Sequence, residues 1–143
     1  YDFYHTYDYH LISCNSSKET PILVTYTHND VLVALPLLLR KIDNSNFFDF
    51  TSIYGYGGPV GKNIKKSFDA IHFQNELVNY FNDKQIVSVF TRLHPYISEQ
   101  DIIMSSFGEL TSLGRIVNID VTLPIEESRR AYQKSLKNQV NKC

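Results

Sequence analysis

The sequence predicts a mixed α/β fold in which a partly antiparallel sheet is flanked by helices. Three observations support this prediction. Runs rich in β-branched residues alternate with amphipathic helical stretches, two adjacent runs have the pattern of a hairpin, and no segment is repeated. The 143 residues are 43% apolar and 20% charged, a composition that can bury a core and is too apolar for a disordered chain. We therefore expect a single domain over residues 1–143.

The formal net charge is −1, which gives no overall attraction to nucleic acid or to an anionic membrane. We expect no stable nucleic-acid binding.

Cys14 and Cys143 have neither metal nor disulfide spacing, and the polar first residues are no secretory signal, so a cytoplasmic location is favoured. The basic stretch 129–142 has two interpretations. It is a solvated helix face, or it associates with a phosphate or an anionic lipid surface.

The amino-terminal elements are a short helix and a hairpin. Aromatic and apolar residues at helical spacing predict an amphipathic helix within 1–14, and a polar break follows at 15–20. The runs 22–27 and 31–40 are rich in Val, Ile, Leu, Thr and Tyr and are separated by turn-forming residues, which predicts a hairpin. Because proline cannot donate a ladder hydrogen bond, Pro36 predicts that the second run is an edge strand or is bulged.

A third strand is expected at 50–54, followed by a glycine-rich loop at 55–61. Residues 65–83 then have helical periodicity, and Asn63 or Ser67 is the expected N-cap. Five residues are expected on the apolar face of this helix: Ala70, Phe73, Leu77, Tyr80 and Phe81.

The carboxyl-terminal half is expected to hold two strands and two helices. The almost unbroken apolar run 86–93 is typical of a strand covered on both faces. A short helix is expected at 98–104 and a further strand at 114–122. Pro124 suits the first position of a final helix, with acidic residues in its first turn and lysines near its end.

The glycine-rich loop 55–61 is the first candidate for a binding site, because such loops can point backbone N–H groups at a phosphate or carboxylate. Tyr56 and Asn63 occupy the places where a P-loop needs Gly and Ser or Thr. Val60 occupies the place of the third glycine of a dinucleotide fingerprint. Two interpretations remain: a tight turn around Pro59, or a turn that also lines a substrate groove.

The segment that follows the run 86–93 is the second candidate, because ligands tend to bind beyond the carboxyl ends of strands in α/β sheets. Arg92 could hold an anionic group by paired hydrogen bonds, and His94 could act as a base or donor. The alternative is structural: Arg92 pairs with a carboxylate of the protein, and His94 caps the strand end.

No catalytic residue can be assigned from the sequence. No serine lies in a nucleophile elbow, and the histidines are too scattered to predict a metal site. Five tyrosines could stack on a substrate or belong to the core: Tyr4, Tyr7, Tyr9, Tyr54 and Tyr56.

Several segments are similar, in order, to those of one family. Residues 54–59 (YGYGGP) are similar to a "YGYPGP" loop, and 90–95 (FTRLHP) resemble an "F-x-R-x-H-P" strand end. Residues 119–123 (IDVTL), followed by a helix with Tyr132 and a basic end, resemble the "IDL…Y.k..R..I.k" segment. Further similar segments are the opening, Tyr4-His5-Thr6 with Tyr9-His10, and Ala34-Leu35-Pro36-Leu37 in the hairpin. Over most of its length the chain thus resembles the FemAB-like branch of the GNAT acyltransferase superfamily.

The resemblance implies a GNAT-like acyl-CoA N-acyltransferase fold and places this chain as the amino-terminal lobe of a two-lobed enzyme. Such enzymes transfer an acyl or aminoacyl group to an amine in cell-wall or cell-surface biosynthesis. The implied donor is acyl-CoA or aminoacyl-tRNA, with no cofactor bound in this lobe. The implied partners are a carboxyl-terminal lobe and a cell-wall precursor or other amine-bearing small molecule. The implied substrate-binding residues are Tyr54, Tyr56, Gly57, Gly58, Arg92 and His94.

Two features depart from the family pattern. The pyrophosphate-binding Arg/Gln-x-x-Gly-x-Gly/Ala motif is absent, and Lys137-Asn138 stand where members often carry two arginines. Three functions therefore remain: an acceptor-side lobe, a non-catalytic binding or assembly module, and a single-lobe acyl-CoA-dependent N-acetyltransferase. If a second lobe is missing, its contact face should be apolar and exposed, which favours a homodimer of the isolated domain.

Overall fold

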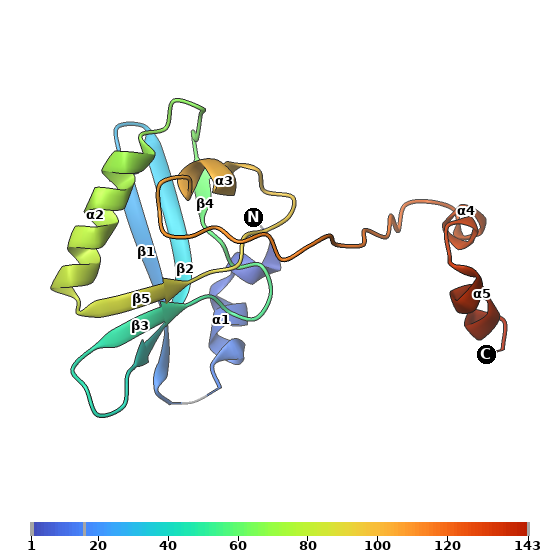
Figure 1. Cartoon of the computed structure of the whole chain (residues 1–143), viewed down its shortest axis with the longest axis horizontal. Helices are drawn as coiled ribbons and strands as arrows, with labels where there is room; N and C mark the ends of the chain where they lie inside the picture. The colour runs from blue at the N-terminus through green and yellow to red at the C-terminus, as the bar shows by residue number, and fades with distance from the viewer. Residues whose placement is uncertain (1, 16, 143) are drawn as a thin grey trace. The chain divides into compact units, whose positions relative to one another are not determined.

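The computed structural model describes residues 2–15 and 17–142, which fall into two units, Tyr1–Leu110 and Thr111–Cys143 (Figure 1). The expectation of a single domain remains a prediction. Cys143, one of the two expected free thiols, lies outside the described residues. Within those residues no helix is long and apolar enough to cross a bilayer.

The first unit contains a mostly antiparallel sheet with helices on both faces. Its strands run in the order β1-β2-β3-β5, and β4 pairs with the same edge of β2 as β3, nearer the hairpin turn. Among the described strands, only β3 and β5 are parallel neighbours. This confirms the predicted mixed α/β class. In chain order the elements are η1 (Phe3–His5), α1 (Tyr7–Ser13), β1 (Glu19–His28), β2 (Val31–Lys41), β3 (Phe48–Thr51), β4 (Val60–Lys62), α2 (Ala70–Asp83), β5 (Ile86–Phe90) and α3 (Glu99–Ile103).

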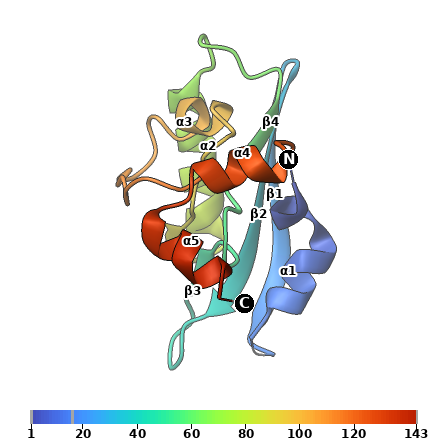
Figure 2. The same cartoon turned by 90° about the vertical axis from the view of Figure 1, so that its right-hand side faces the viewer.

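The main core lies between the sheet and α2. Figure 2 shows α2 and α3 on one side of the sheet and α1 on the other. Alternate β2 residues face α2, where Phe73, Leu77 and Phe81 are buried at helical spacing, as predicted. Helix α2 begins later than expected. Asp69, and not Asn63 or Ser67, caps it, because the Asp69 carboxylate accepts the His72 N–H at 2.9 Å.

The predicted hairpin is confirmed, since β1 and β2 pair in unbroken register around a two-residue turn. The expectation for Pro36 is wrong on both counts: β2 is a central strand and has no bulge there. Pro36 lies between the stretch that pairs with β4 (32–34) and the stretch that pairs with β3 (38–41). Its missing N–H therefore interrupts no ladder.

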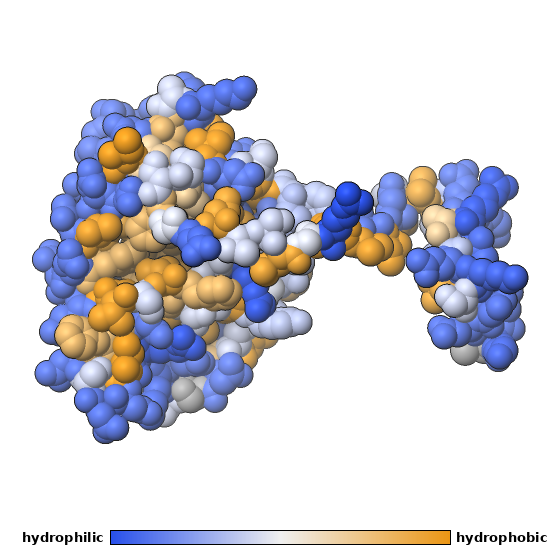
Figure 3. Space-filling view, viewed as in Figure 1, coloured by the Kyte–Doolittle hydropathy of each residue, from blue (hydrophilic) through white to orange (hydrophobic). Residues whose placement is uncertain are grey.

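The prediction that the strand within 86–93 is covered on both faces is also wrong. Strand β5 ends at Phe90 and is the last strand of the sheet, with β3 as its neighbour. Val87 and Phe90 on this strand are more than half exposed. Figure 3 shows apolar side chains gathered on this part of the surface.

The second unit holds two short helices, α4 (Ile125–Arg130) and α5 (Lys134–Val140), where one final helix was expected after Pro124. The strand expected at 114–122 does not form. Asp120 instead accepts the N–H and the hydroxyl of Thr122 at 2.9 and 2.6 Å, which closes a local turn.

Candidate functional site

The two candidate segments meet because β3 and β5 are parallel, so that their carboxyl ends lie at the same edge of the sheet. Just beyond these ends, the Ser52 N–H donates to the Phe90 carbonyl at 2.7 Å. The Arg92 N–H donates to Oγ of Ser52 at 3.3 Å. The glycine-rich loop and the segment after β5 are therefore joined, although each follows a different strand.

Arg92 lies near two aromatic rings. Its Cζ atom is 5.7 Å from the ring centroid of Tyr54 and 5.8 Å from that of Phe90. Both rings are well exposed, Tyr54 at 83% and Phe90 at 55%. Among the described residues no carboxylate forms an ion pair with Arg92. Its forked donors are therefore available to an anionic ligand, beside two flat apolar surfaces.

His94 is fixed by hydrogen bonds on both ring nitrogens. Its Nδ1 accepts the N–H of Tyr96 at 3.1 Å, and its Nε2 lies 2.8 Å from Oδ2 of Asp2. Because a nitrogen that accepts an N–H carries no proton, we assign the proton to Nε2, which donates it to the carboxylate. The other Asp2 oxygen accepts the Tyr4 N–H at 2.9 Å. His94 thus has no free lone pair with which to act as a base.

His5 connects the amino-terminal turn to the glycine-rich loop. Its Nδ1 accepts the Asp2 N–H at 3.1 Å, and its Nε2 donates to the Gly58 carbonyl at 3.2 Å. Burial lowers the pKa of His5 below 6.5, although the nearby Asp2 carboxylate and the bond to Gly58 act in the opposite direction. The neutral ring is the form that can make both of these bonds.

The fully buried Gln100 holds both segments of the site. Its Oε1 accepts the N–H of His94, and its amide packs against Gly58. A Cβ atom on Gly58 would lie 2.7 Å from Oε1 of Gln100, so glycine is required there by the close approach. Gly57 is buried in the same loop, against Ile53.

Tyrosines support the loop from the amino-terminal side. The ring of Tyr4 lies 5.5 Å from that of Tyr9 and 5.8 Å from that of Tyr56, and Tyr56 lies 5.7 Å from His94. Burial raises the pKa of Tyr4, so its hydroxyl stays protonated. Gly55 adopts φ +112°, and a Cβ atom there would overlap the Tyr4 ring.

The structure brings together the six residues expected to bind substrate, and it adds supporting residues that sequence reasoning missed: Asp2, His5, Ser52 and Gln100. No spacing signal could have found Asp2, His5 and Gln100, because they come from distant parts of the chain, and no motif marked Ser52 within the expected strand 50–54.

Within residues 2–15 and 17–142, no group of three or more His, Cys, Asp or Glu side chains could hold a metal ion. The geometry instead suits a ligand with one anionic group and an apolar or planar part, since Arg92 and its two rings supply matching contacts. Comparison of the chain with protein-family models, with curated proteins and with solved structures finds no match in any of the three.

Proposed function

We propose that this chain is the acceptor-side lobe of a FemAB-like amine acyltransferase with a GNAT-like fold. In this proposal Arg92 holds an anionic group of the acceptor. The observation that carries the proposal is the position of Arg92 beyond two parallel strand ends, near two exposed aromatic residues and without an ion-pair partner among the described residues. The ordered resemblance of segments 54–59 and 90–95 to the family motifs supports it.

The reaction would form a C–N bond as the acceptor amine attacks the acyl carbonyl carbon. The C–O bond of an aminoacyl ester, or the C–S bond of a thioester, would break, and the amine proton would leave with the departing group or pass to solvent. A lobe that fixes the acceptor accelerates this reaction by holding the amine in position. His94 and His5 have no free lone pair, so we assign binding to this lobe and the donor site to a carboxyl-terminal lobe.

The surface of β5 supports such a partner lobe. Val87 and Phe90 expose 56% and 55% of their surface on an edge strand, and Phe47 beside β3 exposes 48%. Apolar side chains on an open sheet edge are typical of a surface that contacts another protein segment. A second copy of the isolated chain could cover the same surface, which is the basis of the expected homodimer.

The experiment compares Arg92→Ala with Arg115→Ala, which removes an exposed arginine from the second unit. Calorimetric titration with a uridine-diphosphate-linked muramyl pentapeptide, an anionic cell-wall precursor that carries an amine, measures the dissociation constant. We expect Arg92→Ala to weaken binding by about tenfold or more, the loss typical of a charge-assisted hydrogen bond. Arg115→Ala should bind like the parent chain. Equal binding by the two variants would remove Arg92 from its proposed role.

The second candidate is a non-catalytic binding or assembly module derived from such a lobe. It is favoured by the two histidines of the site, because each is held by local hydrogen bonds and neither is free to move a proton. The length of the intact polypeptide separates the candidates. A reading frame with a second lobe that transfers labelled acyl groups supports the enzyme, and a frame limited to one lobe supports the module.

A further inference from the structure

The outer edge of β1 has unpaired backbone groups. Strand β1 is the first in the sheet order and pairs with β2. A two-residue turn makes His28 and Val31 a hydrogen-bonded pair, so the alternation of an antiparallel ladder points the N–H groups of Leu23, Thr25 and Thr27 outward. No backbone hydrogen bond from another described residue reaches this edge.

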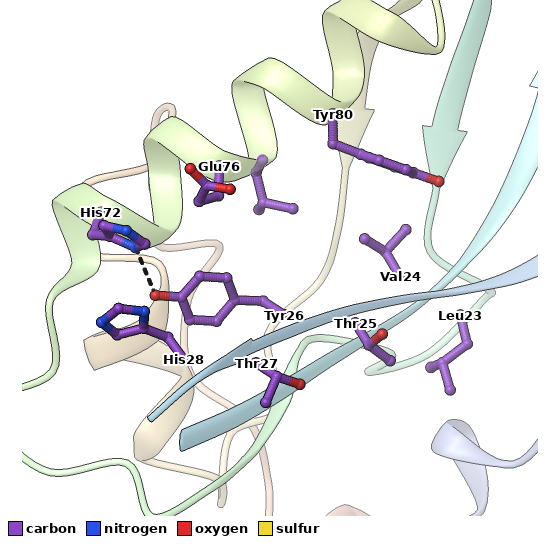
Figure 4. Close-up of a pocket in the computed structure, with 10 residues that line it drawn as sticks. Leu23, Val24, Thr25, Tyr26, Thr27, His28, His72, Glu76 and Tyr80 are labelled. Carbon is purple, nitrogen blue, oxygen red and sulfur yellow. Dashed lines mark hydrogen bonds between the residues drawn. The ribbon is translucent and has the colours of Figure 1, made fainter. Parts of the chain in front are cut away.

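A groove of about 600 Å³ runs along this edge, between β1 and α2 (Figure 4). Its strand wall consists of consecutive residues, Leu23–His28, and its helix wall of His72, Glu76, Leu77 and Tyr80. Successive side chains of a strand point to opposite faces of the sheet, so consecutive residues can line the same groove only if it follows the edge of the strand. At roughly 3.3 Å per residue the strand wall is about 20 Å long, which matches an extended peptide of six residues.

The walls of the groove determine which side chains it can accept. Val24 and Leu77 form a buried apolar floor. At one end the ring of His72 lies 4.5 Å from that of His28, and its Nδ1 is 2.8 Å from the Tyr26 hydroxyl. Glu76 is the one acidic side chain of the lining, which contains no lysine or arginine, and no described residue forms an ion pair with it.

We propose that the groove between β1 and α2 binds an extended peptide, which adds a strand to the free edge of β1. Along the free edge of β1, alternate residues direct their N–H and C=O groups outward, with a repeat of ~6.6 Å. The backbone of a second strand has the same repeat, so the proposed ligand is a peptide. The charge of Glu76 selects a lysine or arginine on the face that meets α2, and the apolar floor selects aliphatic residues on either side of it.

The first test uses the end-blocked, fluorescein-labelled heptapeptide Thr-Val-Thr-Lys-Thr-Val-Thr, which is the same in both strand directions. Anisotropy and backbone amide shifts of the chain are measured. We expect shifts in Leu23–His28 and in the facing turns of α2, and about fivefold weaker binding when the central lysine is replaced by glutamate. Absence of binding at millimolar peptide would overturn the proposal.

N-methylation then distinguishes strand addition from nonspecific adhesion. One peptide is methylated on its threonines and another on its valines and lysine, because only one alternate set of N–H groups can face β1. The set that faces β1 depends on the direction of the added strand, so strand addition predicts that a third peptide, methylated on both sets, loses binding while at least one of the singly methylated peptides keeps it. Undiminished binding of the fully methylated peptide would contradict an added strand.

Two pairs of protein variants complete the test. Glu76→Lys should reverse the preference between the lysine and glutamate peptides, whereas Glu109→Lys, an exposed change away from the groove, should not. Thr25→Pro removes an outward N–H and should weaken binding, and Thr25→Val should retain it. Circular dichroism checks the fold of each variant.

If the chain dimerises through β1, seen by light scattering and by concentration-dependent β1 amide signals, the occupant is a second copy and the peptide proposal is wrong.

Discussion

Nε2 of His94 lies 2.8 Å from Oδ2 of Asp2, and this hydrogen bond joins two residues that are 92 positions apart in the chain. The same carboxylate accepts the Tyr4 N–H, so it caps the amino-terminal turn while it fixes the segment after β5. The shape of the candidate site therefore depends on a contact between the start of the first unit and the segment that follows β5.

Asp2→Ala should destabilise the fold by about 1–3 kcal/mol, because it leaves the ring Nε2–H of His94 and the backbone N–H of Tyr4 without their acceptor. Urea denaturation followed by circular dichroism measures the free energy of unfolding. Asp83→Ala, an exposed change at the end of α2, is the control and should stay within about 0.5 kcal/mol of the parent. A similar loss in both variants would contradict a structural role for the Asp2–His94 bond.

Gly58→Ala should cost about 1–3 kcal/mol, because the new methyl group would collide with the buried Gln100 amide. The double variant with Gln100→Ala tests this reason directly. Removing the amide makes room for the methyl group, so the double variant should lose less stability than the sum of the losses in the two single variants. Strict additivity in urea denaturation would show that the strain arises elsewhere in the loop.

The stability of the chain should fall as the pH is lowered through 6.5, because burial lowers the pKa of His5 in the folded state. The unfolded chain then binds more protons than the folded chain, so stability is greatest above 6.5 and declines until the folded-state pKa is passed. The measurement is the urea midpoint at a series of pH values. His5→Gln keeps a donor toward Gly58 without titrating and should show a smaller decline. An identical pH dependence in the variant would assign the effect to other groups.

Acetyl-CoA should not raise the melting temperature of this chain, because the pyrophosphate-binding glycine motif is absent and we assign the donor site to another lobe. Differential scanning fluorimetry at millimolar ligand checks this. A clear upward shift would favour the single-lobe acetyltransferase over the acceptor lobe, and desulfo-CoA would then show whether the nucleotide part is sufficient.

Local patterns predicted the hairpin and the core face of α2. The alternation of side chains in a strand, and their recurrence every three or four residues in a helix, depend only on residues close in the sequence. They also placed Arg92 and the loop around Gly58 at strand ends. The parallel pairing that brings these segments together is a long-range property and was visible only in the structure.

The failed predictions have the same origin. Residues 114–122 are rich in Ile and Val, as strands are, but a strand also needs a partner, and none pairs with this segment. The run 86–93 has the composition of a central strand, but β5 is at the end of the sheet order. Asp2 and Gln100 contribute through tertiary contacts, for which a single sequence holds no periodic signal.

On the edge of β2 that pairs with β3 and β4, the stretch around Pro36 pairs with neither strand, and the glycine-rich loop connects the two strands across this unpaired stretch. The loop leaves β3 at Thr51, which pairs with Leu38, and enters β4 at Val60, which pairs with Ala34. Both of its anchors are therefore on one continuous strand, four residues or roughly 13 Å apart. Pairing with β2 fixes the distance between the two ends of this loop. An inserted or deleted residue therefore has to change the conformation of the loop itself, because neither end can move. Length variation that ordinary surface loops tolerate should be selected against here.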